Sequence, residues 1–332
     1  MEHNYKTNYN VLDSNKSYFY VIAINCCLSF VVFFVMSLVA KILGVSYQSL
    51  SAEQWYIYLT IIITPVAYLT LYLIYHKRTK IEIFKRLSKF NVLYALLAVA
   101  LGAVCLFAVA PITNWLSYLL QSAGVRMDAD LTFKMNNWWS IVLGIVGYAL
   151  LPAVAEELIY RKVILNGYLS RYTIFGSVLI TTLMFTFMHG SIRQFIYQLV
   201  LGAVLTALAV VTKKVIYPII MHFTNNCLVV VLSITGGEYL VSGMAMPVSI
   251  GWNIALYAII AVIAIVLMFG VLYYIYRHHT NALNDNDTNI IVSNKFSLRG
   301  FVKSQSQQEQ LYLIAGVVTA LIIWITNTIS YF

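Results

Sequence analysis

Two adjacent carboxylates, Glu156 and Glu157, are the residues of this sequence whose position most needs a chemical explanation. The chain has 12 acidic residues, and only these two lie well inside apolar runs. A charged side chain within a membrane segment is costly, so it normally faces a cavity or a partner and indicates function. The same comparison among the 6 histidines leaves His189 and His222. Carboxylates and imidazoles can activate water and stabilise an oxyanion, which is the chemistry of hydrolysis.

The first of three short motifs joins a carboxylate to a cation. Glu157 and Arg161 are four residues apart, and this spacing places them on one face of a helix. The guanidinium can hold Glu157 ionised and orient it, which leaves Glu156, about 100° round the helix, free for another task. A buried ion pair that only fixes helix packing would explain Glu157 and Arg161 almost as well.

The other two motifs supply imidazole and amide groups. Phe185 and His189 are four residues apart, and so are His222 and Asn226. Either histidine alone would more often be an interhelical hydrogen-bonding residue than a catalyst. Their occurrence beside the only acids in apolar runs favours a catalytic interpretation, with a base for water and donors for an oxyanion.

The spacing along the chain predicts that these motifs meet. Glu156 and His189 lie equally far from position 172.5, which is beside the turn-like stretch at residues 166–171 that contains Gly167. An antiparallel helical hairpin folded there would place both residues at similar depth. Straight helices that cross the whole membrane would place them at different depths, and we favour the hairpin because hydropathy fixes helix boundaries only to within several residues.

Two prolines strengthen this expectation. Pro152 and Pro218 each precede a key residue, Glu156 and His222, by four positions. Proline inside a helix kinks it and frees a carbonyl group. Such breaks are tolerated in membranes where they line a cavity.

The composition predicts an all-α fold, a polytopic transmembrane helical bundle. The chain has 332 residues and is 61% hydrophobic, and several of its apolar runs exceed the ~18 residues that cross a bilayer. We expect about eight spans and a ninth at the C-terminus. The expected spans cover residues 18–43, 54–75, 91–120, 138–165, 172–191, 193–211, 216–235, 250–276 and 311–332.

The motifs divide the chain into a central part and its flanks. The polar stretch before the last apolar run predicts a flexible connection, rich in Asn, Ser and Gln. The expected parts are N-terminal transmembrane helices (1–137), a catalytic helical core (138–235), a further span (236–276), the polar connection (277–310) and a C-terminal apolar helix (311–332).

The basic residues predict the orientation in the membrane. Alternate loops of the span model place 17 Lys and Arg on one side and 4 on the other, out of the 21 in the chain. Positive loops stay in the cytoplasm, so we expect a multi-pass protein of the cell membrane with a cytoplasmic N-terminus. The net charge of +9 is explained by these loops and indicates no nucleic-acid partner.

The three motifs together resemble a known family. EExxxR at 156–161, FxxxH at 185–189 and HxxxN at 222–226 follow one another on successive apolar segments. In this order they look like the CPBP family, which comprises the type II CAAX prenyl proteases and the bacteriocin-processing or Abi proteins. The resemblance covers roughly residues 138–235, under a third of the chain.

The resemblance implies an α-helical intramembrane endopeptidase. Carried over by motif position, Glu156 and His189 would activate a water molecule, while His222 and Asn226 would stabilise the oxyanion. The substrate would be a membrane-associated peptide or protein, such as a leader, a pheromone, a bacteriocin or a membrane protein tail, met in the lipid bilayer. Supporting roles would fall to Glu157, Arg161 and Phe185.

The motifs are compatible with two modes of water activation, one without a cofactor and one with a metal. Activation of water by side chains requires no cofactor. Members of the family are often described as metalloproteases, however, and two histidines with one glutamate are a known zinc ligand set with an open fourth position. Zinc is therefore the alternative, with Glu156, His189 and His222 as its candidate ligands.

Two other functions compete with proteolysis. A proton-coupled transporter would also carry Glu and His near the midplane, but it predicts broken helices in repeated halves, and the sequence shows no repeat. A non-catalytic bacteriocin-immunity or scaffold protein could keep the same fold and bind a partner. The intact motif residues disfavour this second alternative without removing it.

Overall fold

Long apolar runs become long helices in this protein, because only a helix satisfies the backbone polar groups of a single segment in a membrane. The structure is a computed structural model that describes residues 9–79, 90–125, 137–192, 194–234, 250–282 and 297–329. Within these ranges there are helices and no strand, as the expected all-α fold requires. Seven helical segments are long and apolar enough to cross a membrane, and two shorter apolar helices accompany them among the described residues. The protein is a multi-pass membrane protein.

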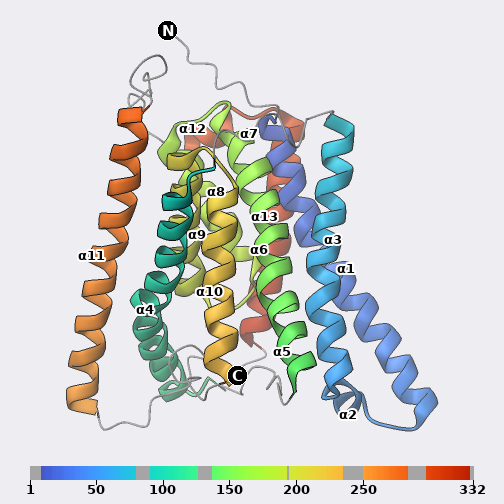
Figure 1. Cartoon of the computed structure of the whole chain (residues 1–332). Helices are drawn as coiled ribbons and strands as arrows, with labels where there is room; N and C mark the ends of the chain where they lie inside the picture. Colours follow the sequence, from blue (N-terminus) through green and yellow to red (C-terminus); the bar gives the residue numbers. More distant parts are fainter. Residues whose placement is uncertain are drawn as a thin grey trace.

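The helices follow the expected apolar runs closely (Figure 1). The first group comprises α1 (Val11–Leu43), α2 (Tyr47–Ser51), α3 (Gln54–Thr79) and α4 (Val92–Ser122). A long helix follows in five segments, α5 (Trp138–Gly144), η1 (Ile145–Leu150), α6 (Leu151–Glu157), η2 (Leu158–Ile164) and α7 (Leu165–Leu169). The remaining helices are α8 (Ile174–Met188), α9 (Phe195–Thr212), α10 (Ile216–Ile234), α11 (Ile250–Ala282), α12 (Leu298–Lys303) and α13 (Gln307–Ile329).

The long helix that carries the two glutamates is irregular on both sides of them. Its first residue is capped by Asn137, whose side chain accepts from the Ser140 amide. The segments η1 and η2 are π-helical and flank α6, and such wider turns occur often at functional sites. Pro152 lies directly after η1 at the start of α6, so the expected irregularity is present there. Pro218 is instead in the first turn of α10, where proline breaks no helical hydrogen bond.

The predicted hairpin forms, although its turn lies a few residues later than expected. The helix continues through residues 166–169, and the turn is at residues 170–173, where the Thr173 hydroxyl accepts from the Gly176 amide and begins α8. Gly167 does not make the turn. It lies where the helix meets the start of α1, and a Cβ atom there would collide with Ser14. The absence of a Cβ atom at Gly167 allows the two helices to pack closely instead.

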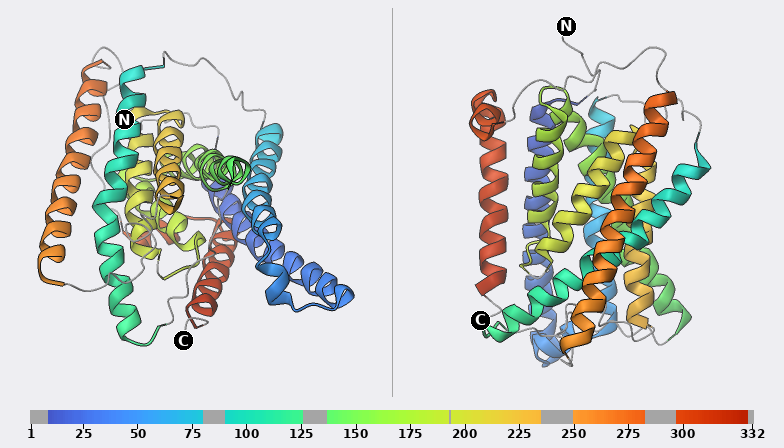
Figure 2. Two further views of the ribbon diagram at one scale, coloured as in Figure 1. Left: turned by 60° about the horizontal axis from the view of Figure 1, so that its bottom comes forward. Right: turned by 90° about the vertical axis from the view of Figure 1, so that its left-hand side faces the viewer.

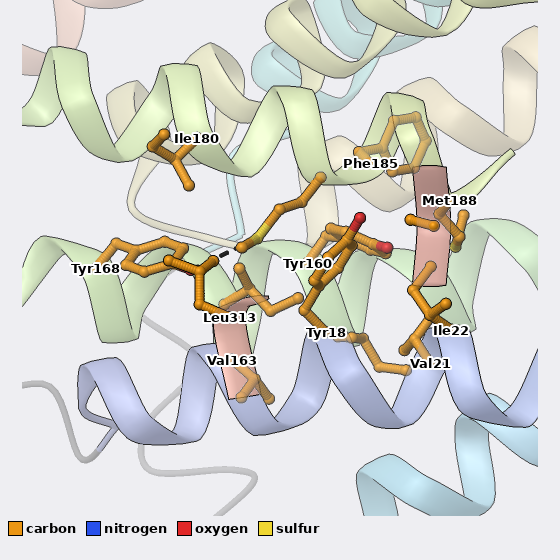
Figure 3. Close-up of a cluster of buried hydrophobic side chains, with 14 of the residues drawn as sticks. Tyr18, Val21, Ile22, Tyr160, Val163, Tyr168, Ile180, Phe185, Met188 and Leu313 are labelled. Atoms are coloured by element: carbon orange, nitrogen blue, oxygen red, sulfur yellow. Dashed lines mark hydrogen bonds between the residues drawn. The ribbon is translucent and has the colours of Figure 1, made fainter. Parts of the chain in front are cut away.

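Buried apolar side chains form two main cores on either side of the central helices. Figure 3 shows the first, in which Tyr18 and Ile22 of α1 meet Tyr160, Phe185 and Leu313 of three other elements. The second joins α4, α9, α10 and α11. In Figures 1 and 2, α11 lies at the outer edge of the bundle beside α4. The helix α10, which carries His222, contributes Tyr217 and Met221 to the second core.

The C-terminal part differs from its expected description. Residues 277–310 were expected to form a flexible connection, but α11 continues to residue 282, and α12 and the start of α13 occupy residues 298–309. Buried Asn15 donates to the Gln305 side chain and to the Glu309 carbonyl, at 2.9 and 2.8 Å. Polar residues here are ordered by hydrogen bonds rather than by apolar burial, which composition does not reveal. Residues 283–296 are outside the described part.

The ends of the described chain lie at opposite ends of the bundle. Figure 1 shows α1 beginning at the end where α12 lies, and α13 running from there towards the other end. The two helices pack along each other, so they run side by side in the same direction. This arrangement agrees with a C-terminal helix that crosses the whole bundle.

Candidate active site

Glu157 is the centre of a buried polar cluster. Its Oε1 accepts a hydrogen bond from Nη1 of Arg161 at 2.7 Å and faces Nδ1 of His222 at 2.9 Å. The side chains of the ion pair have a relative exposure of 0%, and His222 is 3% exposed. The pairing of Glu157 with Arg161 was expected from their spacing. The contact with His222, 65 positions along the chain, was not expected. A spacing of four residues relates only residues of the same helix.

Phe185 covers the cation and lies near both histidines. The Arg161 guanidinium lies 4.4 Å from the centre of the Phe185 ring, within the range of a cation–π interaction. The same ring is 4.8 Å from the His189 ring and 6.1 Å from the His222 ring. Gly202 of α9 allows this arrangement, because a Cβ atom there would lie 2.9 Å from Phe185 and the Gly202 carbonyl accepts from Arg161.

His189 lies at the end of a helix that is too short to cross a membrane. The 15 residues of α8 extend roughly 22 Å, so His189 stops within the bundle instead of reaching the far side. Glu156 precedes the 170–173 turn by roughly 21 Å of helix at 1.5 Å per residue. The similar depth expected for Glu156 and His189 therefore follows from the shortness of α8. Hydropathy had predicted that this helix continues to residue 191.

Hydrogen-bond chemistry fixes the tautomer of His189. Its Nδ1 lies 2.8 Å from the Phe185 carbonyl oxygen. A carbonyl can only accept, so Nδ1 must carry the proton and donate it. In the neutral ring, Nε2 is then the nitrogen with a free lone pair. His189 is thus prepared to accept a proton or a hydrogen bond from water.

The same argument identifies the ring nitrogen of His222 that donates to Glu157. Glu157 is held by Arg161 as a carboxylate, so Nδ1 of His222 is the donor in their 2.9 Å contact. Nε2 of His222 can then donate to an oxyanion only when the ring is an imidazolium. Two carboxylates and one guanidinium leave the cluster one positive charge short of neutrality, and buried net charge is costly.

Asn226 is held by a hydrogen bond to a backbone carbonyl four residues before Pro152. Its Nδ2 donates to the Tyr148 carbonyl at 3.2 Å. Pro152, four residues after Tyr148, has no N–H with which to make the usual helical bond to that carbonyl. The amide nitrogen of Asn226 has two protons, so one can hold this position while the other remains for a ligand.

Within the described residues, Glu156 interacts electrostatically with both members of the ion pair but makes no hydrogen bond to either of them. Its Oε2 is buried and has no hydrogen-bond partner among the described residues. Glu156 lies close enough to His222 to interact with it electrostatically, and His222 interacts in the same way with His189. No hydrogen bond joins Glu156 to His189 in the described part of the chain. His222 and Arg161 therefore each interact with both Glu156 and His189.

The structure adds supporting residues that sequence patterns did not single out. Asn225, fully buried beside Asn226, accepts from the Tyr197 hydroxyl at 2.7 Å and donates to the Gly102 carbonyl at 3.1 Å. This residue ties α10 to α9 and α4. The pair of adjacent asparagines in an apolar run was the available signal, because each amide in such a run needs its own partners.

The candidate zinc ligands do not form a metal site in this geometry. Among the described residues there is no group of three or more His, Cys, Asp or Glu side chains placed to hold a metal ion. Glu156, His189 and His222 therefore do not fit a zinc ion as they stand.

Helices, burial and donor groups together define a multi-pass membrane protein with an acid–histidine–amide cluster buried between its helices. Residues 137–228 of the chain match the family described as type II CAAX prenyl endopeptidase Rce1-like. This segment is a CAAX protease-like domain, and it contains all three motifs on which the resemblance rested. No curated protein matches the chain, and no solved structure matches it either.

Proposed function

We propose that this protein is an intramembrane endopeptidase that hydrolyses a peptide bond of a membrane-associated peptide or protein. The observation that carries the proposal is the division of the two glutamates. Glu157 is fully engaged at Oε1 by Arg161 and His222. Among the described residues no such bond holds Glu156, and its buried Oε2, like Oε2 of Glu157, has no hydrogen-bond partner there. A carboxylate in this condition is suited to act as a base for water.

In the proposed mechanism Glu156 and His189 activate the water, while His222 and Asn226 stabilise the oxyanion. Glu156 takes a proton from the attacking water, and His189 orients that water through the lone pair of Nε2. The water oxygen bonds to the scissile carbonyl carbon, and the carbonyl oxygen becomes an oxyanion that accepts hydrogen bonds from the His222 imidazolium and the Asn226 amide. When this intermediate collapses, the C–N bond breaks and the proton held by Glu156 passes to the leaving amine nitrogen. Preorganised donors aimed at a developing charge are among the largest contributions to enzymatic rate. Glu157 keeps His222 protonated at Nδ1 and correctly turned.

The proposed substrate is amphipathic or membrane-embedded, because the cluster is buried within apolar helices. Lipid-anchored tails, leaders and short processed peptides all satisfy this condition. Processing of a bacteriocin or a prenylated tail would be a special case of the same reaction. The lipid bilayer is the second partner, and the proposal involves no nucleic acid.

The test compares membrane peptides from cells that express the wild-type protein with those from cells that express Glu156→Gln. The proposal expects a defined set of peptides whose new ends depend on Glu156. Identical peptide sets would remove the protease assignment and favour a scaffold. A proton flux that depends on Glu156, without cleavage, would favour a transporter.

A metal analysis of the purified protein belongs to the same test. Proteolysis by side chains alone predicts full activity in a metal-free sample treated with chelator. A stoichiometric zinc that is lost in both His189→Ala and His222→Ala would overturn the oxyanion role of His222, because both rings would then be ligands.

A further inference from the structure

The C-terminal helix α13 contacts both ends of α8, the helix that carries His189. It lies beyond residues 137–228, so the CAAX protease-like domain does not include it. It packs along α1 and also against α8. Figure 2 shows it at the edge of the bundle. These contacts connect a peripheral helix to the candidate active site.

The first contact lies at the start of α8. Arg171, in the turn before α8, makes two hydrogen bonds with the carboxylate of Glu309, at 2.9 and 2.8 Å. Two parallel bonds of this kind fix orientation as well as distance. The bonds with Glu309 raise the pKa of the Arg171 guanidinium above its ordinary value, so the arginine stays charged at neutral pH. The neighbouring Tyr172 hydroxyl donates to the Phe301 carbonyl at 3.2 Å.

The second contact lies at the other end of α8. Nδ2 of Asn327 donates to the Gly190 carbonyl at 2.9 Å, one residue after His189. Gly190 adopts a φ of 61°, which favours glycine and ends the helix sharply. A Cβ atom at Gly190 would lie 3.1 Å from Nδ2 of Asn327 and 3.2 Å from Ile323. The chain after His189 is therefore closely covered by α13.

We propose that α12 and α13 act as a clamp that sets the position of α8 between these two contacts, with Asn327 as a positioning residue for His189. A helix of 15 residues cannot place its ends at both surfaces of a membrane, so something else must fix where His189 stops. Glu309 holds the first end of α8 through Arg171, and Asn327 holds the last through Gly190. The role in catalysis rests on the proposed protease function.

The test uses a variant that removes the donor without changing the shape. The Asp side chain has the same size, but a carboxylate and the Gly190 carbonyl are both acceptors. Asn327→Asp therefore loses the hydrogen bond to Gly190. Thr326→Ala is the matched control, because the Thr326 hydroxyl donates only to carbonyls of its own helix, those of Ile322 and Ile323. Both variants change the same exposed turn of α13.

Misplacing a catalytic group by about 1 Å can lower the rate by up to ~100-fold. We therefore expect Asn327→Asp to lower kcat by about 10-fold with KM nearly unchanged, and Thr326→Ala to change neither. A rise in KM alone, or equal behaviour of the two variants, would overturn the positioning role. At the other end, Glu309→Arg should lower activity and Arg171→Glu in the same protein should restore it.

A second measurement does not depend on proteolysis. Hydrogen exchange at residues 189–192 should be faster in Asn327→Asp than in the wild type or in Thr326→Ala. Faster exchange in a protein that cleaves nothing would support the clamp and remove only the proposed function. Unchanged exchange in Asn327→Asp would contradict the clamp even if the protein is a protease.

Discussion

At the scale of single residues, position in the sequence gave less information than hydrogen-bond partners. Glu156 and Glu157 are adjacent and chemically identical, yet Oε1 of Glu157 is held by Arg161 and His222. Among the described residues no such contact holds Glu156, and Oε2 of each glutamate is buried without a hydrogen-bond partner there. The spacing predicted the pair of Glu157 and Arg161. It could not predict that Glu157 also fixes His222, because that contact depends on how α10 packs against α6.

Glu157→Gln is expected to destabilise the protein because it leaves the Arg161 guanidinium buried without its counter-charge. Removing one partner of a buried ion pair costs about 3–5 kcal/mol. Thermal unfolding in detergent measures this loss, and Glu156→Gln at the next position is the control that should unfold close to the wild-type temperature. Equal unfolding temperatures for Glu157→Gln and the wild type would show that the pair does not stabilise the fold.

The two adjacent asparagines should separate function from stability. Asn226→Ala removes a proposed oxyanion donor, and such a loss typically lowers kcat by ~100- to 1,000-fold. Asn225→Ala should instead lower the free energy of unfolding, since it leaves the Tyr197 hydroxyl without its buried acceptor, at a cost of about 1–3 kcal/mol, and removes the side-chain donor to the Gly102 carbonyl. Cleavage rates and unfolding curves for both variants test this division. The assignment fails if Asn225→Ala is the variant that folds normally and loses cleavage.

At the scale of helices, apolar runs predicted the elements well and their ends poorly. The expected break at Pro152 is present, but the expected break at Pro218 is not, because Pro218 falls in the first turn of its helix. The turn of the hairpin came later than expected, since Gly167 packs against α1. Residues 298–309 appeared to be a linker by composition, and long-range hydrogen bonds to Asn15 and Arg171 order them.

Pro152→Ala tests whether the irregular helix matters for the site. Alanine supplies an N–H that can bond to the Tyr148 carbonyl and so compete with Asn226 for it. We expect kcat to fall by about 10-fold through the displaced amide, while the unfolding temperature stays the same or rises. Pro218→Ala, in the first turn of α10, is the matched control and should leave kcat unchanged. Equal rates for the two variants would show that the Tyr148 contact does not position Asn226.

At the scale of the whole molecule, the charge distribution predicts an orientation that the helical bundle does not itself define. The 17 to 4 division of the 21 Lys and Arg residues predicts that the end of the bundle where α1 begins faces the cytoplasm. Reporter fusions at residues 10, 290 and 332 should give cytoplasmic, cytoplasmic and external signals. A cytoplasmic signal at residue 332 would mean that α13 does not cross the membrane.

The central claim is that Glu156 activates water for cleavage of a peptide bond. The most direct measurement follows cleavage of a substrate peptide by the purified protein in lipid bilayers, with products identified by mass spectrometry. We predict that Glu156→Gln retains the wild-type unfolding temperature and loses at least ~100-fold in rate, the scale of general-base catalysis. Cleavage at the wild-type rate by folded Glu156→Gln protein would contradict the account.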